Sequence, residues 1–183
     1  MGSEMCIRDS YNDVVRWMYD SLYEMNIECD VVDVNALDTQ RYQMIVTPAL
    51  YCASEKLLEK LEDFVKEGGV LVSTFKSFVA DEYFTVYADK QPHRLHECFG
   101  MSYNQFTEPG KTKITGRPVK YFAELLKPEG AETLAGYEHK YWGTYAGITR
   151  NSREKGKAYY IGCYTDKDVL KDILRKAAED AGV

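Results

Sequence analysis

Residues 41–75 constrain the fold of this chain more than any other stretch. Two short apolar runs, residues 43–47 and 70–75, flank a segment with helical spacing. Ser54 is a candidate N-cap for that helix, and two glycines at 68–69 are typical of its end. The apolar residues that share one helical face are Leu57, Leu58, Leu61, Phe64 and Val65. The pattern predicts a strand–helix–strand unit, the building block of a parallel sheet.

Further elements are predicted on both sides of this unit. Residues 11–25 have helical spacing and end at Asn26, and the β-branched residues 28–34 favour a strand. Thr165 is a candidate N-cap for a last helix. That helix should bury Val169, Leu170, Ile173, Leu174, Ala177 and Ala178. The other predicted strands are residues 101–108, 131–137, 147–151 and 157–163, while residues 119–126 fit either a strand or a helix.

These elements predict an α/β fold. The expected architecture is a three-layer α/β/α sandwich around a mostly parallel sheet, of the flavodoxin-like kind. The order of helices and strands resembles that of class I glutamine-amidotransferase-like domains. We expect one such domain over residues 11–183. The first ten residues, MGSEMCIRDS, have no periodicity, so we interpret residues 1–10 as a non-native leader and expect the natural protein to extend upstream.

Composition excludes several function classes. A net charge of −6 over 183 residues, without a basic stripe, argues against a nucleic-acid partner. The sequence contains neither an apolar run long enough for a membrane span nor a secretory signal, so no membrane partner is expected. The cysteines are odd in number and scattered, at Cys6, Cys29, Cys52, Cys98 and Cys163. Reduced thiols of this kind indicate a cytoplasmic protein.

Metal and cofactor sites are not favoured. His93 and His96 are three residues apart, with Glu97 and Cys98 adjacent, but this spacing is common on surface helices. The turn at residues 48–53 contains no glycine, so it cannot cradle a phosphate as dinucleotide-binding loops do. We therefore expect neither a metal nor a cofactor.

Candidate nucleophiles and acids also lack the context that catalysis needs. Ser73, Ser77 and Cys52 lie near strand ends, but no glycines flank them and no His-x-acid pair follows a late strand. Asp81 and Glu82 are adjacent, which seldom gives the two-sided geometry of a glycosidase pair. We predict no catalytic residue in this chain.

Several motifs resemble one known family. They are VTPALY at 46–51, EGGVLVST at 67–74, VADE at 79–82, LLKPEGAETLA at 125–135 and AGITRNSREKGKAYYIGC at 146–163. They resemble the middle domain of glycoside hydrolase family 42 β-galactosidases, and the resemblance extends over residues 11–183. One departure lies at residues 88–92, which keep only the proline of a G-Y-P-G stretch.

The resemblance implies a function outside catalysis. In that family the catalytic glutamates lie on an N-terminal barrel, and the middle domain mediates trimer formation without amidotransferase activity. The implied partners are the protein's own catalytic barrel and the neighbouring subunits of a homotrimer. Two alternatives remain, a carbohydrate-binding module and a stand-alone amidotransferase-like enzyme.

Aromatic side chains in two loops are the candidate contacts. Residues 77–90 form a long polar and aromatic loop, of a length that is uncommon without a function, and residues 139–142 form a second aromatic loop. Rigid aromatic anchors in a polar rim are typical of interfaces. The candidate interface residues are Asp81, Glu82, Tyr83, Phe84, Tyr87, Phe99, Tyr141 and Trp142.

Overall fold

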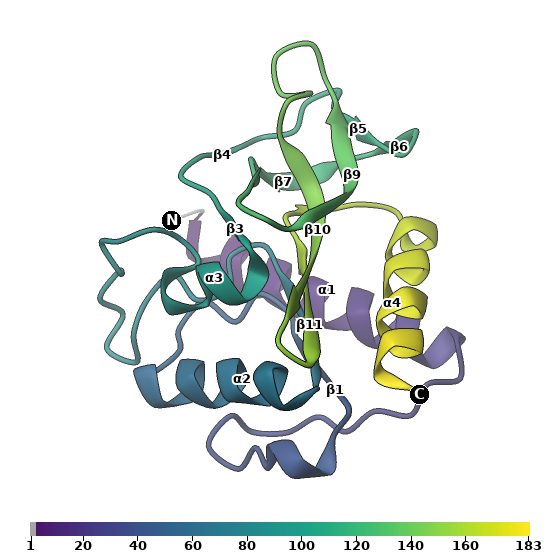
Figure 1. Ribbon diagram of the computed structural model, residues 1–183. Coiled ribbons are helices and arrows are strands. Elements are labelled where there is room, and N and C mark those ends of the chain that lie inside the picture. The colour runs from purple at the N-terminus through teal and green to yellow at the C-terminus, as the bar shows by residue number, and fades with distance from the viewer. Residues whose placement is uncertain (1–2) are drawn as a thin grey trace.

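A mixed seven-stranded sheet runs through the centre of the molecule (Figure 1). The computed structural model describes the backbone of residues 3–183 and the side chains from Tyr11 onward. The strand order is β1-β2-β11-β10-β9-β5-β6. These strands are β1 (Met44–Thr47), β2 (Val70–Thr74), β5 (Lys113–Ile114), β6 (Arg117–Pro118), β9 (Glu132–Glu138), β10 (Ala146–Arg153) and β11 (Gly156–Ile161).

Two small antiparallel sheets and the helices complete the domain. One small sheet has the order β12-β7-β4, and the other pairs β3 with β8. Their strands are β3 (Met101–Ser102), β4 (Phe106–Thr107), β7 (Lys120–Glu124), β8 (Lys127–Pro128) and β12 (Cys163–Tyr164). The helices are α1 (Ser3–Glu24), α2 (Glu55–Glu67), α3 (His96–Phe99) and α4 (Lys167–Ala181), with 3-10 turns η1 (Thr39–Arg41) and η2 (His93–Leu95). No helix among residues 3–183 is both long and apolar enough to span a membrane.

The predicted strand–helix–strand unit is confirmed. β1 pairs in parallel with β2, in the register that places Met44 opposite Val70. Ser54 Oγ accepts a hydrogen bond of 3.3 Å from the Leu57 N–H and so caps α2. The helix ends at Gly68, whose φ of 122° is a conformation that glycine adopts without strain. All five predicted face residues of α2 are buried.

The two faces of β2 build two apolar cores. Successive side chains of a strand point to opposite sides. Val70 and Val72 therefore join the core that contains Trp17 and Leu170, from α1 and α4. Leu71 joins the other core, with the apolar face of α2 and with α3. Figure 1 shows α2 and α3 on one side of the strands and α4 on the other. Trp17 is 3% exposed and belongs to a core.

The predicted fold class is wrong. Within the seven-stranded sheet, β1–β2 and β2–β11 are the parallel pairs, whereas β11–β10, β10–β9, β9–β5 and β5–β6 are antiparallel. The domain is thus a β-rich mixed structure, not a mostly parallel α/β/α sandwich of the flavodoxin-like or amidotransferase-like kind. The physical reason lies in the connections. A parallel crossover needs about a dozen residues, usually a helix, whereas residues 101–164 pass through strands and tight turns.

Local predictions near the two ends had mixed outcomes. Residues 28–34 form no strand, because no neighbouring strand pairs with them. The side chain of Val31 is accordingly 84% exposed. α1 begins at Ser3, earlier than expected, and Asn26 follows it with a φ of 58° as predicted. The predicted leader, residues 1–10, lies partly outside the described residues and stays a prediction. The buried face of α4 is confirmed, but its N-cap is Asp166, because Thr165 Oγ1 donates to the Pro118 carbonyl.

Candidate functional site

A cavity of about 1080 Å³ opens beside the carboxyl ends of β1 and β2. One wall is the loop that follows β2, residues 76–91, and the opposite wall comes from β3, β4, β7 and β8. Much of the lining is apolar or aromatic, contributed by Tyr51, Val79, Phe84, Val86, Phe106 and Phe122.

Glu124, the last residue of β7, is a buried carboxyl group in the cavity lining. It is 1% exposed. Its Oε1 accepts a hydrogen bond of 2.8 Å from the Lys76 N–H, and its Oε2 accepts one of 2.9 Å from the Tyr160 hydroxyl. Burial raises the pKa of Glu124 to about 7, because the charged form loses its hydration and these hydrogen bonds only partly replace it. Near neutral pH the group therefore exists in both protonation states.

Two further residues of the lining carry polar atoms that lie beneath the solvent-accessible surface. The Tyr103 hydroxyl and the Gln91 Oε1 are buried and have no hydrogen-bond partner among the described residues. Tyr103 is 7% exposed, and burial raises its pKa well above the usual value. Buried polar groups are normally satisfied.

The turn after β2 is strained, and it shapes the cavity. Lys76 and Phe78 adopt φ values of 59° and 63°, in the left-handed region that non-glycine residues rarely occupy. The turn directs the Lys76 N–H to Glu124, and it holds the Lys76 Nζ 4.5 Å from the ring centroid of Phe122. Strain of this kind often accompanies a functional site.

The candidate nucleophiles near these strand ends have structural roles. Ser73 Oγ lies 2.6 Å from Thr47 Oγ1, which links β2 to β1. Ser77 Oγ donates to the Thr47 carbonyl at 3.3 Å and accepts from the Leu50 N–H at 3.2 Å. Burial, with a smaller contribution from Asp81, raises the pKa of the Cys52 thiol and disfavours the nucleophilic thiolate.

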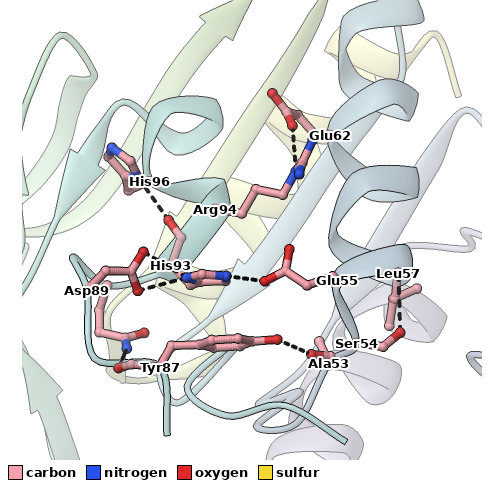
Figure 2. Close-up of polar contacts among 11 residues, drawn as sticks. Ala53, Ser54, Glu55, Leu57, Glu62, Tyr87, Asp89, His93, Arg94 and His96 are labelled. Atoms are coloured by element: carbon pink, nitrogen blue, oxygen red, sulfur yellow. Dashed lines mark hydrogen bonds and ion pairs between the residues drawn. The ribbon is translucent and has the colours of Figure 1, made fainter.

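His93 attaches the loop wall to α2 (Figure 2). Its Nδ1 lies 2.7 Å from an Asp89 oxygen, and its Nε2 lies 2.5 Å from Glu55 Oε1, in the first turn of the helix. The ring of Tyr87 stacks on the imidazole, and its hydroxyl donates to the Ala53 carbonyl at 2.8 Å. Burial opposes a charged imidazole, but the two carboxylates outweigh it and raise the pKa of His93.

Further contacts of the same segment leave the histidines without a metal site. Arg94 Nε donates to Glu62 at 3.0 Å, and His96 Nδ1 lies 2.8 Å from the His93 carbonyl oxygen. Among the side chains that the structure describes, from Tyr11 onward, no group of three or more His, Cys, Asp or Glu is placed to hold a metal ion. The histidines therefore serve the attachment of the loop.

The structure separates the predicted interface residues into surface and interior groups. Tyr83, Phe84 and Tyr141 are 81%, 77% and 71% exposed, and Glu82 is also exposed. Asp81 shapes the loop tip, because its Oδ1 accepts from the backbone N–H groups of Tyr83 and Thr85 at 2.9 and 2.8 Å. Trp142 is half-buried and stacks on His139 with ring centroids 4.0 Å apart.

The interior group contains Phe99 and Tyr87. Phe99 is fully buried and meets the Tyr160 ring edge-on at 5.2 Å, so it is a core residue and not a surface contact. Tyr87 is half-buried against His93. Glu124, Tyr103 and the exposed Phe106 were missed by the sequence reasoning. The available signal was the single acid of YFAELL at 121–126, within a segment whose helix or strand state was ambiguous.

Comparisons with known proteins point to one family. The family model described as the β-galactosidase trimerisation domain matches residues 4–183. β-Galactosidase BgaA of Planococcus sp. (strain 'SOS Orange') is 30% identical over 188 residues, which cover 96% of this chain and 28% of that protein. BgaB of Geobacillus sp. (strain Y412MC61) is 30% identical over 173 residues, which cover 91% and 26%.

The fold comparison agrees. The crystal structure of β-galactosidase from Bacillus circulans sp. alkalophilus matches with a TM-score of 0.88 and 27% identity, over 94% of this chain and 27% of that one. This chain therefore spans little more than a quarter of the length of the relatives it matches. With the match over residues 4–183, the chain belongs to the β-galactosidase trimerisation domain family, the non-catalytic middle domain of glycoside hydrolase family 42 enzymes.

Proposed function

We propose that this chain joins the subunits of a homotrimeric β-galactosidase, and that the catalytic groups of that enzyme lie on other parts of its polypeptide. The relatives named above are β-galactosidases, and this chain corresponds to about a quarter of their length. Its partners would be a catalytic barrel of the same polypeptide and the neighbouring subunits.

Two separate exposed aromatic patches carry this proposal. One is the loop tip with Tyr83 and Phe84, and the other is the β9–β10 loop with Tyr141. Figure 1 shows the β9–β10 loop projecting at the top of the molecule, away from α2 and α3. A ring of three subunits around one axis joins two different patches on each subunit. Two patches on different loops are what such a closed ring requires.

Both patches rest on firm supports. Asp81 closes the loop tip through two backbone hydrogen bonds, and the His93 contacts fix the base of the same loop. In the second patch, Trp142 stacks on His139 and packs against the core. Anchors that are already ordered lose little conformational entropy on association. This favours a role in assembly over a role as flexible linkers.

The local chemistry supports a non-catalytic role. The hydroxyls of Ser73 and Ser77 are engaged with β1 and its following turn, and Cys52 is biased toward the neutral thiol. A nucleophile needs an adjacent base that withdraws its proton. These contacts give the two serines structural partners instead.

Reduced thiols support a cytoplasmic location within the same proposal. Cys29, Cys52, Cys98 and Cys163 are all free cysteines. Burial raises the pKa of Cys98 and of Cys163 to about 12, so both remain protonated thiols at cellular pH.

Sedimentation velocity of the longer enzyme that carries this chain tests the proposal. The expected result is a trimer that dissociates when the aromatic side chains of the loop tip are removed. A wild-type enzyme that sediments as a monomer at micromolar concentration would overturn it. Galactosidase assays on residues 1–183 alone test the second part, and turnover by this chain would contradict a non-catalytic role.

A further inference from the structure

The two exposed aromatic patches of this domain differ in shape. The β9–β10 loop, residues 139–145, projects from the sheet at the top of the molecule (Figure 1). The other patch, Tyr83 and Phe84, lies at the cavity beside β1 and β2, whose lining includes Phe84. None of the described residues of the β9–β10 loop lines this cavity. One chain therefore carries a projection and a hollow at separate places, and its own projection does not fill its own hollow.

The apolar lining of the cavity is open to solvent. Phe84, Val86 and Phe106 are 77%, 56% and 68% exposed, and all three line the cavity. Exposed apolar side chains that gather in one hollow indicate an interaction site. The carboxyl group of Glu124 already accepts hydrogen bonds from within the fold. The hollow therefore favours an aromatic side chain over a polar ligand.

Tyr141 is the exposed ring of the projecting loop, and the turn that carries it is ordered. The Tyr141 N–H donates to His139 Nδ1 at 3.3 Å, and the Gly143 N–H donates to the His139 carbonyl at 3.0 Å. The His139 ring in turn stacks on Trp142, which packs against the core. A tyrosine held in this way offers a large apolar ring at a low cost in conformational entropy.

The two surfaces also carry opposite charges. Residues 77–89, which include the loop wall of the cavity, contain the acids Asp81, Glu82 and Asp89 and no Lys or Arg. Residues 139–145 contain Lys140 and no acid. Lys140 is exposed, and its Nζ lies 5.3 Å from the ring centroid of Tyr141, so the positive charge accompanies the projecting ring. Complementary charges favour the approach of two surfaces and fix their orientation.

We propose that the cavity receives Tyr141 of a neighbouring copy of this chain. The ring packs against Phe84 and Phe106, and Lys140 of the same neighbouring copy lies toward Glu82. The volume of about 1080 Å³ exceeds that of one aromatic side chain, so part of the turn enters with Tyr141. This inference rests on the proposed function, because it states which two surfaces of a homotrimer meet. A contact between two different surfaces closes into a ring when the rotation between copies allows it.

A double-mutant cycle in the longer enzyme tests the contact, with association measured by sedimentation at several concentrations. Tyr141→Ala and Phe106→Ala should each weaken association at least about tenfold. The double variant should lose little more than either single variant, because the two removed side chains contact each other across the interface. Tyr23→Ala, at an exposed tyrosine of α1, is the matched control and should change association neither alone nor together with Tyr141→Ala. Circular dichroism of each variant checks that the fold is retained.

A charge reversal tests the orientation independently. Lys140→Glu places an acid against the acidic loop wall and should weaken association about fivefold at low ionic strength. Adding Glu82→Lys to the same chain should restore most of that loss. A variant that associates poorly because it is misfolded would not be repaired by a second surface substitution, so recovery reports the contact itself.

Several outcomes would overturn this inference and leave the proposed assembly role intact. One is a trimer whose association is unchanged by Tyr141→Ala and by Phe106→Ala. Another is a double variant in which the two losses multiply, since that result places the side chains in separate contacts. A third is Lys140→Glu that Glu82→Lys does not repair. A parent enzyme that sediments as a monomer would instead refute the assembly role and this inference together.

Discussion

The imidazole of His93 lies parallel to the ring of Tyr87, with centroids 3.6 Å apart and an interplanar angle of 4°. The two nitrogens of the imidazole lie within hydrogen-bond distance of the carboxylates of Asp89 and Glu55. One histidine thus connects the cavity loop, through two carboxylates and one aromatic ring, to the first turn of α2 (Figure 2). A protonated ring makes each of these contacts stronger, since it donates from both nitrogens and carries a charge that the Tyr87 face attracts.

Loop order should therefore depend on pH through His93. Because the fold raises the pKa of His93, the charged ring stabilises the loop fully below the ordinary histidine pKa. This stabilisation is lost as pH rises through the pKa of His93 in the folded chain. We expect amide exchange in residues 77–91, corrected for intrinsic rates, to become faster as pH rises from 6 to 9. His93→Asn should remove this dependence and leave the loop fast at all pH values. His139→Asn, in the other aromatic loop, is the control, and equal behaviour of the two variants would refute the role of His93.

Glu124 should make the folded state less stable at higher pH. Its pKa is raised to about 7 in the folded chain. Between the ordinary pKa of a glutamate and pH 7, the folded chain therefore keeps a proton on Glu124 that the unfolded chain has released. The free energy of unfolding should decrease by about 2–4 kcal/mol from this group between pH 4 and pH 8. Because His93 acts in the same direction, the comparison must be between the parent and Glu124→Gln in urea titrations. A difference between the two proteins that does not vary with pH would contradict this assignment.

Gly156 should not tolerate a side chain. A Cβ atom there would lie 2.1 Å from the Val65 carbonyl oxygen and 2.3 Å from that of Gly69, both backbone atoms. Gly156→Ala must push β11 away from α2, which we expect to cost about 3 kcal/mol or more of unfolding free energy. Gly110→Ala is the matched control: its φ is 55°, but nothing lies within 4 Å of the new Cβ. It should cost only about 1 kcal/mol, so similar urea midpoints for the two variants would refute the close approach.

The loop tip should contribute to assembly more than other exposed aromatics do. In the longer enzyme, the double substitution Tyr83→Ser, Phe84→Ser should weaken association at least tenfold, since buried aromatic anchors dominate interface energies. Tyr23→Ser removes a comparable tyrosine, 70% exposed on α1, and should leave association unchanged. Sedimentation at several concentrations measures both. Because both sites are exposed, circular dichroism should show the same fold for each variant.

The family resemblance and the short elements were accessible from the sequence because they depend on local spacing. The face of α2, the end of α2 at Gly68 and the buried face of α4 each follow from residues within a few turns of one another. The motifs at 46–51 and 146–163 identified the family that the comparison over residues 4–183 confirms.

What only the tertiary structure decided depends on partners that are distant in the chain. The direction of strand pairing is set by which strands meet, so four antiparallel pairs in the large sheet overturned a prediction drawn from one parallel unit. Residues 28–34 have strand composition but no neighbouring strand. Burial by the tertiary fold raises the pKa of Glu124, and the hydrogen bonds from Lys76 and Tyr160, 48 and 36 residues away, only partly offset that rise. Spacing along the chain determined the elements and the family, whereas burial and long-range pairing, which no local pattern encodes, decided the sheet and the cavity.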